Sequence, residues 1–241
     1  MEPTWTSDCG TVNLWLGDCL PIIEGWPESL EIVADPPFGI SLKPQYGNGT
    51  RRYPDGSYRQ PAKQYEPVIG DSEPFDVAIL ERFSKQLLWG ANNYGLSGGR
   101  WLIWDKRLGI CPPRSQADCE IAWHSEGGSA RIFRHMWDGM VRDSERGTKR
   151  EHPTQKPIAV MKWCLKFAAG ELIGDPYMGT GATGIAAVAM GRKFYGCEID
   201  PTYFEIAKRR ITDELNRFPL LEGVETKPTQ SALSFPGDSD E

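Results

Sequence analysis

The sequence predicts an α/β fold in which helices cover both faces of an open, mostly parallel sheet. Short apolar runs with the length of buried strands alternate along the chain with longer segments in which apolar residues recur at helical spacing. Several of the short runs end at aspartate, glycine or proline, which are typical of the loops that follow strands. At 241 residues the chain is long enough for one well-buried domain with a short appendage.

Two strands are expected near the N-terminus. Residues 11–16 alternate apolar and polar side chains and end at Gly17-Asp18. Residues 31–34, with the sequence EIVA, form a short β-branched run that stops at Asp35-Pro36, because proline cannot continue a central strand. Both predicted strands therefore end at an acidic residue.

The middle of the chain is expected to hold one helix and two strands. Asp76 is suited to cap a helix that extends to about Trp89, since apolar side chains recur on one face of that segment. Residues 101–104 and 119–123 are short apolar runs that predict strands, whereas residues 124–153 are polar, basic and irregular.

The C-terminal third alternates helix and strand most regularly. Pro157 suits the first turn of a helix that runs to Ala169, and Asp200-Pro201 suits the start of a helix that ends near Phe218. Between these helices the sequence predicts a strand, a glycine turn that opens a helix, and a second strand, over residues 172–175, 179–190 and 193–199.

We expect a single domain over residues 1–218. Within it, residues 41–69 predict a long mobile loop, and residues 124–150 predict a short insert. From residue 219 to 241 the composition turns to Pro, Ser, Thr and acidic residues, which predicts a disordered tail without a core of its own.

Composition and cysteine usage favour a cytoplasmic globular protein. Apolar residues make up 39% and charged residues 25% of the chain, and no uninterrupted apolar run is long enough to span a bilayer. The N-terminus lacks the pattern of a secretory signal. The six cysteines form no Cys-x-x-Cys pair and have no finger-like spacing with histidine, so we expect reduced thiols and no metal site.

The charge of the chain is uneven in a way that suits a nucleic-acid partner. The net charge is −6, but residues 43–63 carry +4 and residues 131–150 carry +3, which leaves −13 for the remainder. Phosphate binding needs a local basic surface and not a basic average. Either run alone is typical of a solvated loop, and together they favour nucleic-acid contact.

The acidic ends of four predicted strands are expected to meet. In open parallel sheets, ligands bind beyond the carboxyl ends of the strands. Asp18, Asp35, Asp175 and Glu198 each lie just past, or at the tip of, a predicted strand. We therefore expect them to share one crevice.

A glycine-rich turn follows the strand that ends at Asp175. Gly179-Thr-Gly181-Ala-Thr-Gly184 fits G-x-G-x-x-G, and Glu198 lies at the tip of the next strand, where an acid can accept two ribose hydroxyls. Either a dinucleotide or S-adenosylmethionine presents such a ribose. Asp175 favours S-adenosylmethionine, because a carboxylate suits the cationic amine of its methionine end and is awkward beside a pyrophosphate.

Asp35-Pro36-Pro37-Phe38 offers the groups needed to methylate an exocyclic amine of a nucleobase. Such an amine is a poor nucleophile, and acceptors that hold both of its hydrogens push the nitrogen towards tetrahedral geometry. The Asp35 carboxylate and the Pro36 carbonyl are two such acceptors, and consecutive prolines hold them in fixed positions. Phe38 offers a flat face on which a flipped base can stack. The motif alone is also compatible with a plain proline-rich turn.

Taken together, these motifs resemble the β-class DNA amino-methyltransferases, which act on adenine N6 or cytosine N4, and particularly their compact phage and prophage members. In that family a D-P-P-[YF] motif is catalytic and a D-P-F-x-G-x-G motif binds S-adenosylmethionine. The catalytic motif comes first in this chain, as in the permuted β-class. Gly17-Asp18-Cys-Leu, Trp89-Gly-Ala-Asn92, Trp101–Lys106 and His152–Pro157 also resemble segments of the family, so that the resemblance covers residues 11–218.

The resemblance implies a Rossmann-like S-adenosylmethionine-dependent methyltransferase fold, with S-adenosylmethionine as cofactor, and it assigns residues to roles. The expected catalytic residues are Asp35, Pro36, Pro37 and Phe38. The expected cofactor-binding residues are Asp18, Asp35, Thr154, Gln155, Lys156, Asp175, Pro176, Tyr177, Gly179, Gly181 and Glu198. The candidate DNA contacts are Lys43, Arg51, Arg52, Tyr53, Arg131, Arg134, Arg146, Lys149 and Arg150.

The chain departs from the family pattern at a few positions. Tyr177 replaces the usual phenylalanine, and Phe38 in place of tyrosine keeps the aromatic face. The space for target recognition at 124–150 is short for the class, which argues against recognition of a long, stringent site. A homodimer is common in the class, and a cognate restriction enzyme is an expected partner for some members.

The expected function is methylation of adenine N6 in DNA, because Asp at position 35 favours adenine by family tendency. Four alternatives stay open, and one of them is methylation of an amine in RNA or protein. Cytosine-N4 methylation uses the same motifs. A nicotinamide- or flavin-dependent oxidoreductase would use the glycine turn but leave Asp35–Phe38 without a role. A DNA-binding subunit that has lost catalysis predicts a damaged motif, and the motifs here are intact.

Overall fold

The structure is a computed structural model that describes residues 1–39, 69–107, 117–138, 141–148, 151–152 and 154–217. Within these residues a nine-stranded sheet has the order β1-β2-β11-β10-β3-β4-β6-β5-β7. Its strands, in chain order, are β1 (Trp5–Thr6), β2 (Val12–Leu16), β3 (Glu31–Ala34), β4 (Gln86–Trp89), β5 (Arg100–Asp105), β6 (Cys119–His124), β7 (Arg131–Arg134), β10 (Leu172–Asp175) and β11 (Lys193–Glu198).

The centre of the sheet is parallel, as predicted. The strands β2, β11, β10, β3 and β4 run parallel to one another, and the antiparallel pairs are β1–β2, β4–β6 and β5–β6. The six strands predicted from apolar runs are all present, with ends that differ by at most two residues. Because β3 and β10 are neighbours, the turns that follow them lie side by side at one edge of the sheet.

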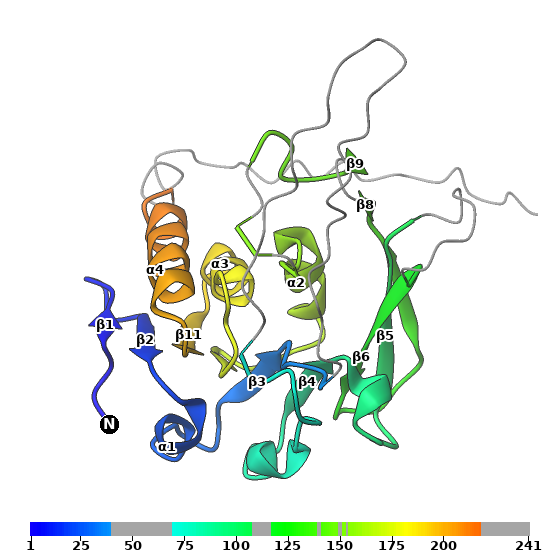
Figure 1. Ribbon diagram of the computed structural model, residues 1–241, viewed down its shortest axis with the longest axis horizontal. Helices are drawn as coiled ribbons and strands as arrows, with labels where there is room; N and C mark the ends of the chain where they lie inside the picture. Colours follow the sequence, from blue (N-terminus) through cyan, green and yellow to red (C-terminus); the bar gives the residue numbers. More distant parts are fainter. Residues whose placement is uncertain (40–68, 108–116, 139–140, 149–150, 153, 218–241) are drawn as a thin grey trace, which may run out of the picture.

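Helices cover both faces of the sheet, which confirms the predicted fold class (Figure 1). The helices α2 (Ile158–Cys164), α3 (Ala182–Ala189) and α4 (Pro201–Leu215) pack on one face, where their apolar side chains form a core with Val12, Val33, Leu102 and Phe194. The short helix α1 (Cys19–Ile23) and the 3-10 turn η1 (Val77–Leu80) pack on the other face. Asp200 caps α4 by accepting from the amides of Thr202 and Tyr203, as its sequence position predicted.

The predicted helix from Asp76 to Trp89 is wrong. Asp76 does accept from the amide of Ala78, but the helical segment ends at Leu80, and Gln86–Trp89 form strand β4. This strand pairs with β3 on one side and β6 on the other, and Leu87, Leu88 and Trp89 are fully buried. The apolar residues at the C-terminal end of this segment are therefore core positions of a strand, and tertiary pairing overrode the local pattern.

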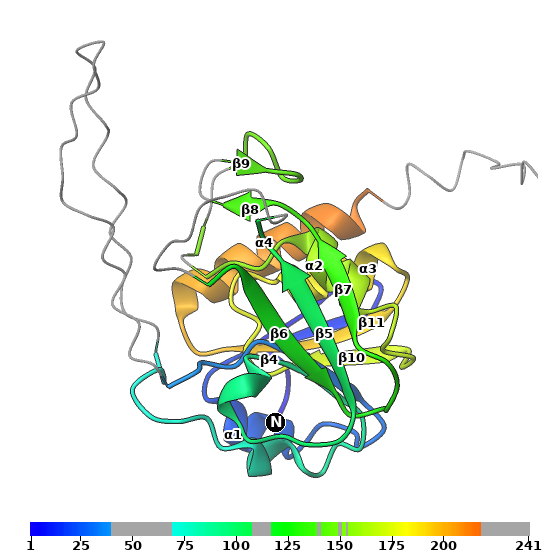
Figure 2. The same ribbon diagram turned by 90° about the vertical axis from the view of Figure 1, so that its right-hand side faces the viewer.

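The segment from 124 to 153 is more regular than predicted. Strand β7 adds a parallel edge to the sheet beside β5 (Figure 2), and β8 (Trp137–Asp138) pairs with β9 (Val141–Arg142) in a separate two-stranded ribbon. Helix α2 is shorter than predicted, since it ends at Cys164 rather than Ala169. The predicted mobile loop at 41–69 lies almost wholly, and the tail at 219–241 wholly, outside the described residues.

In the part of the chain that the structure describes, no helix combines the length and the apolar character needed to cross a membrane.

Candidate active site

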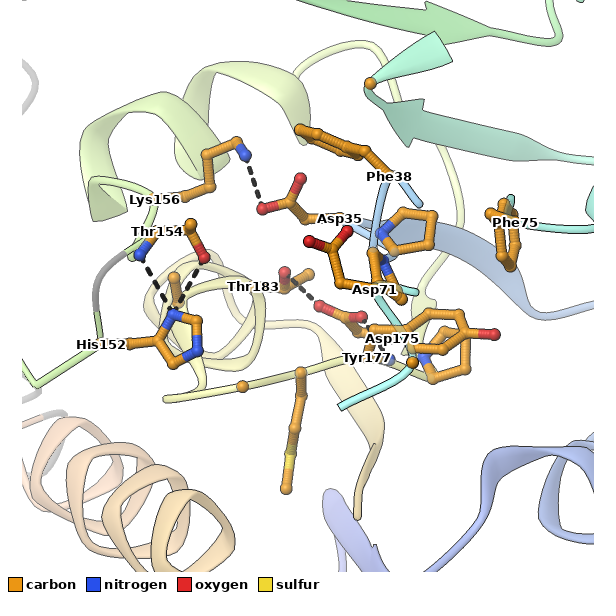
Figure 3. A pocket seen from close by; sticks show the side chains of 18 of the residues that line it. Asp35, Phe38, Asp71, Phe75, His152, Thr154, Lys156, Asp175, Tyr177 and Thr183 are labelled. Atoms are coloured by element: carbon orange, nitrogen blue, oxygen red, sulfur yellow. Dashed lines mark hydrogen bonds and ion pairs between the residues drawn. The ribbon is translucent and has the colours of Figure 1, made fainter. Parts of the chain in front are cut away.

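A cavity of about 1430 Å³ opens at the carboxyl ends of the central strands (Figure 3). Asp18 after β2, Asp35 after β3, Asp175 at the end of β10 and Glu198 at the end of β11 all line it. The structure therefore brings together the four acids that the sequence expected to share a crevice. The volume exceeds that of typical small-molecule pockets, roughly 300–1,000 Å³, so the cavity has room for a nucleoside cofactor and a second group beside it.

The glycine turn between β10 and α3 is held in place by Glu198. One carboxylate oxygen of Glu198 accepts from the amide of Gly179 at 2.9 Å, and the other accepts from the amide of Asp200 at 2.8 Å. Gly179 has a φ of +51°, and a side-chain carbon added there would meet no atom within 4 Å. The turn thus exposes its backbone to the cavity, and burial raises the pKa of Glu198.

Asp175 has both of its carboxylate oxygens occupied. One oxygen accepts from the hydroxyl of Thr183 at 2.6 Å, and the other accepts from the amide of Tyr177 at 3.0 Å. Burial raises the pKa of Asp175 to about 7, although these two hydrogen bonds oppose the shift. A cation bound beside this carboxyl group would favour its ionised form.

Asp35 has one occupied and one free carboxylate oxygen. Its Oδ2 accepts from the ammonium of Lys156 at 2.5 Å, whereas its Oδ1 is shielded from solvent and has no hydrogen-bond donor within the described part of the chain. Burial raises the pKa of Asp35, and the charge of Lys156 opposes the shift. A buried acceptor without a donor is costly, so Oδ1 is suited to accept a hydrogen from a ligand.

Lys156 lies in an array of alternating charges that extends away from Asp35. Its ammonium is 2.9 Å from Glu120 Oε2, and the other oxygen of Glu120 accepts from Lys106 at 2.9 Å. Burial opposes ionisation of Glu120, but Lys156 and Lys106 outweigh it and hold the pKa of Glu120 at about 2. The family resemblance implies that Thr154, Gln155 and Lys156 lie near the methionine carboxylate of the cofactor, and in this structure the Lys156 ammonium contacts Asp35 and Glu120.

Sequence reasoning assigned no role to Glu120 or Lys106. A prediction based on parallel strands looks for site residues at carboxyl ends, but Glu120 is the second residue of β6, which runs antiparallel to β4 and β5. The amino end of β6 therefore lies at the same edge of the sheet as the other strand ends. Lys106 directly follows β5, and the Trp101–Lys106 segment resembles the family, but neither observation gave this side chain a role.

Aromatic side chains line the side of the cavity next to Asp35. The ring of Phe38 lies so close to Gly90 that a side-chain carbon at position 90 would overlap the ring. Glycine directly after β4 therefore allows this approach. The ammonium of Lys156 lies 5.7 Å from the centre of the Phe38 ring and 5.3 Å from that of Trp89. Tyr94, which the sequence did not single out, lies at an angle to Phe38 with ring centres 6.5 Å apart.

The Pro36 carbonyl, expected to be the second acceptor beside Asp35, has a partner in this structure. The hydroxyl of Tyr94 donates to it at 3.3 Å, a long hydrogen bond. Tyr94 is held in turn by an edge-on contact with Phe75, at 5.1 Å between ring centres. The Pro36 carbonyl is therefore held in position, and the Tyr94 hydroxyl that donates to it is weakly bound.

Asp71 is a further buried acid of the cavity that sequence reasoning missed. Its side chain lies close to the cavity with Asp35 and Asp175 (Figure 3), and its Oδ1 accepts from the amide of Gly39 at 2.9 Å. This hydrogen bond connects Gly39, which directly follows the Asp35–Phe38 motif, to a residue 32 positions later in the chain. No sequence pattern marked Asp71, because it follows the long segment at 41–69 and belongs to no predicted element.

The remaining cofactor candidates also reach the cavity. Asp18 accepts from the amide of Leu20 and so caps α1, with its carboxylate at the cavity. Thr154 and Gln155 line the cavity between β9 and α2, and Gln155 is buried. Pro176, Tyr177 and Gly179 line it as well, whereas Gly181 lies behind the turn against α4.

Three of the candidate DNA contacts are described, and all three are exposed. Arg131 and Arg134 lie on the edge strand β7, and Arg146 lies in the turn after β9. The remaining candidates, which are Lys43, Arg51, Arg52, Tyr53, Lys149 and Arg150, lie outside the described residues.

Comparison with protein families matches residues 101–209 to the model N6_N4_Mtase, described as DNA methylase. A type II methyltransferase of Lactococcus lactis subsp. cremoris, M2.LlaDCHI, is 32% identical over 88 residues, which are 36% of this chain and 33% of that protein. The DNA adenine methyltransferase YhdJ of Escherichia coli K12 is 42% identical over 62 residues, which are 25% of this chain and 21% of that protein. The matched stretches thus span a third or less of these curated relatives.

Among solved structures, the PvuII DNA methyltransferase (cytosine-N4-specific) has a TM-score of 0.55 and 16% identity. The likeness covers 90% of this chain and 94% of that one. It shows that the two chains share a fold.

Proposed function

We propose, on the premise that this chain is a DNA amino-methyltransferase of the N6/N4 family, that it transfers a methyl group from S-adenosylmethionine to the N6 amine of adenine in DNA. The observation that carries the proposal is the carboxyl group of Asp35. Its buried Oδ1 lacks a donor in the described part of the chain, its Oδ2 is held by Lys156, and the Pro36 carbonyl stands beside it.

The cavity fits a cationic nucleoside cofactor. Asp35, Asp71 and Asp175 line it, so its potential favours a cation. The exposed backbone of the turn at Gly179 allows close approach of a ligand, and Asp18 and Glu198 place carboxylates at the ends of the neighbouring strands β2 and β11. When bound, S-adenosylmethionine supplies an electrophilic methyl group on its sulfonium.

Each of these acids has a proposed role towards the cofactor. Glu198 accepts hydrogen bonds from ribose hydroxyls with the lone pairs that Gly179 and Asp200 leave free. Asp175 balances the charge of the methionine amine, and its pKa near 7 means that a cation readily shifts it to the ionised form. Thr154 and Gln155 remain our candidates for the methionine carboxylate.

The target amine is activated by Asp35 and Pro36. Asp35 Oδ1 accepts one amine hydrogen and the Pro36 carbonyl accepts the other, which moves electron density onto the nitrogen as it attacks the methyl group. The nitrogen then carries an extra proton, and Asp35 Oδ1 takes it, since burial makes Asp35 a stronger base than an exposed aspartate. Lys156 keeps the carboxylate oriented throughout, and Phe38 offers a ring face for the flipped base.

We propose adenine as the target because Asp stands at position 35 and because the relative YhdJ is named a DNA adenine methyltransferase. We further propose that DNA phosphates contact Arg131, Arg134 and Arg146, which are exposed. A homodimer, and a cognate restriction enzyme as partner, remain proposals. Light scattering of the purified protein with and without DNA would test the dimer.

The decisive experiment identifies the methylated base. Purified full-length protein is incubated with unmethylated genomic DNA and S-adenosylmethionine, and the DNA is digested to nucleosides for mass spectrometry. We expect N6-methyl-2′-deoxyadenosine in amounts that depend on the protein, and sequencing of the same DNA would give the recognised site. N4-methylcytosine alone would replace adenine by cytosine as the target, and absence of any methylated base would overturn the proposal.

A further inference from the structure

We infer that Glu145 couples the turn after β9, which carries Arg146, to the glycine turn of the cofactor site, so that DNA binding and cofactor binding influence each other. The inference rests on the proposed function. The Arg146 turn is defined as residues 143–148, which directly follow strand β9 of the two-stranded ribbon β8–β9. No sequence motif pointed to Glu145, and it lies outside the Asp35–Phe38 motif and the glycine-rich turn at 179–184.

The carboxylate of Glu145 holds together two segments of the cofactor side of the molecule. Its Oε2 accepts from the amide of Ile158 at 3.0 Å, and its Oε1 accepts from the side-chain amide of Gln155 at 3.4 Å. Ile158 is the first residue of α2, and Pro157, at the cap position, provides no side-chain hydrogen bond to the helix. Glu145 thus acts as the missing cap of α2 from 13 residues away.

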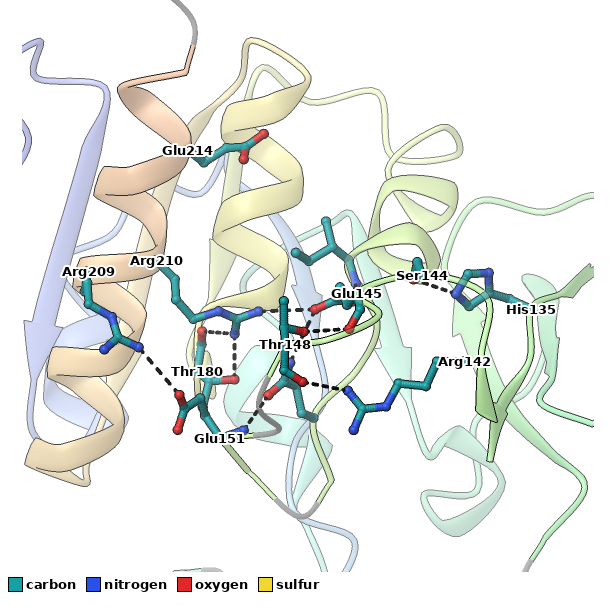
Figure 4. Close-up of polar contacts among 12 residues, drawn as sticks. His135, Arg142, Ser144, Glu145, Thr148, Glu151, Thr180, Arg209, Arg210 and Glu214 are labelled. Atoms are coloured by element: carbon teal, nitrogen blue, oxygen red, sulfur yellow. Dashed lines mark hydrogen bonds and ion pairs between the residues drawn. The ribbon is translucent and has the colours of Figure 1, made fainter. Parts of the chain in front are cut away.

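The same carboxylate reaches the glycine turn through Arg210 of α4 (Figure 4). Arg210 lies 3.5 Å from Glu145 Oε1, and its guanidinium also donates to the carbonyl and the hydroxyl of Thr180 at 2.6 and 3.0 Å. Thr180 lies between Gly179 and Gly181. The side chains of Glu145 and Arg210 are only 13% and 16% exposed, so solvent screens this pair less than an exposed one.

The backbone of the Arg146 turn is organised to direct Glu145 inward. Glu145 has a φ of +52°, the one positive value among the non-glycine residues that the structure describes. This conformation is unfavourable for a side chain such as glutamate and needs support from its surroundings. Thr148 supplies support by donating its hydroxyl and its amide to the Glu145 carbonyl, and Arg142 donates to the Thr148 carbonyl at 3.3 Å.

The next residue in the chain, Arg146, is exposed on the outside of the turn. Arg146 therefore presents a cation to the surface, whereas the preceding residue, Glu145, directs its carboxylate towards the cofactor site. Phosphate contact at Arg146 would favour one arrangement of the Arg146 turn, and the same arrangement sets the positions of Arg210 and Thr180. Because a coupling free energy between two ligands is reciprocal, a cofactor at the glycine turn would change DNA affinity by the same factor.

The test compares Glu145→Gln with Glu151→Gln in the full-length protein. Glu151 pairs with Arg209 of α4 at 3.7 Å, so it also joins the segment before α2 to α4, and its charge acts on Arg210 less strongly than that of Glu145 does. The dissociation constant of S-adenosylhomocysteine is measured by calorimetry, with and without saturating sheared unmethylated DNA. The ratio of the two constants reports the coupling.

For the wild type we expect DNA to tighten S-adenosylhomocysteine binding by at least about fivefold, the lower end of typical coupling between sites. Glu145→Gln keeps an acceptor for Ile158 but loses the charge that holds Arg210, so we expect the ratio to fall to about one. Glu151→Gln should keep the wild-type ratio within a factor of about two, because its partner Arg209 is 60% exposed and a pair with an exposed cation contributes little. Arg210→Lys, which cannot hold Thr180 and Glu145 with one planar group, should reproduce the loss of coupling.

Thermal unfolding of each variant separates loss of coupling from loss of folding, and Arg210→Lys provides the second route if Glu145→Gln does not fold. A wild-type ratio in both Glu145→Gln and Arg210→Lys, or a ratio near one in the wild type, would overturn the inference while leaving the proposed function intact. Failure of the wild type to bind S-adenosylhomocysteine would overturn the proposed function and the inference with it.

Discussion

The cavity contains two Asp-Pro turns on neighbouring strands, Asp35-Pro36 after β3 and Asp175-Pro176 at the end of β10. Because β3 and β10 pair in parallel, both turns lie at the same edge of the sheet. Burial raises the pKa of both aspartates. The same dipeptide at nearly the same place in the fold nevertheless has different partners.

The partners of Asp175 come from its own turn and the helix that follows. The Tyr177 amide and the Thr183 hydroxyl occupy its two oxygens, and both residues lie within eight positions along the chain. Asp35 instead pairs with Lys156, 121 residues away, and keeps Oδ1 without a donor in the described part of the molecule. A locally satisfied acid supports a turn, whereas an acid with a free, buried oxygen is ready to accept a hydrogen from a substrate.

The largest expected effect comes from removal of the free acceptor at Asp35. Asp35→Ala should lower the methyl-transfer rate by at least about 1,000-fold, because both the acceptor for the amine hydrogen and the proton acceptor are lost. The affinity for S-adenosylhomocysteine should stay within about threefold, since the glycine turn and its acids are untouched. Single-turnover transfer of a radiolabelled methyl group and calorimetry measure the two quantities. An Asp35→Ala protein with near-normal transfer would contradict the mechanism.

Asp175→Ala should reverse the order of these effects. Loss of the carboxylate leaves the Tyr177 amide and the Thr183 hydroxyl without their acceptor and removes the charge expected beside the methionine amine. We expect cofactor affinity to fall by about 10- to 100-fold, from the loss of charge-assisted contacts worth about 1.5–3 kcal/mol. The rate with saturating cofactor should fall much less than in Asp35→Ala. If Asp35→Ala and Asp175→Ala lost equal amounts of methyl-transfer rate and of cofactor affinity, the two turns would not have the different roles proposed for them.

The raised pKa of Asp175 predicts a pH dependence of stability. An aspartate in an unfolded chain has a pKa of about 3.9, so between about pH 4 and pH 7 the folded protein keeps a proton that the unfolded chain has lost. The free energy of unfolding should therefore decrease as the pH rises through this window, by up to about 1.4 kcal/mol per pH unit from this one group, and then level off. Urea unfolding from pH 5 to 8 measures this slope. Asp175→Asn should reduce it, and an unchanged slope would contradict the shift.

The smallest expected effect concerns the second acceptor, the Pro36 carbonyl. Tyr94→Phe removes the hydroxyl that donates to it and frees the carbonyl for the target amine. We expect the KM for DNA to fall by about threefold, since one neutral hydrogen bond contributes about 1 kcal/mol and this one is long. Tyr177→Phe, which places the usual family residue in the same aromatic cluster, is the matched control and should leave KM unchanged. A rise in KM for Tyr94→Phe would mean that the Tyr94 hydroxyl helps to bind the target nucleobase and does not compete with its amine for the Pro36 carbonyl.

Much of the site was predictable because its acids mark strand ends. Asp18, Asp35, Asp175 and Glu198 follow short apolar runs, and parallel strands bring their carboxyl ends to one edge of a sheet. Glu120 and Tyr94 were not predictable in this way. Glu120 is the second residue of a strand that runs antiparallel, and Tyr94 follows a segment that the sequence favoured as a helix but that pairs as β4.

The sequence by itself determined the parallel strands, the glycine turn and the two Asp-Pro turns, because strand length, glycine spacing and proline are local properties of the chain. The tertiary structure alone decided which oxygen of Asp35 is free, that Lys156 contacts Asp35 and Glu120, and that Glu145 reaches the glycine turn through Arg210. These contacts join residues far apart in the sequence, and the packing of the sheet and helices sets their distances. No local pattern encodes them.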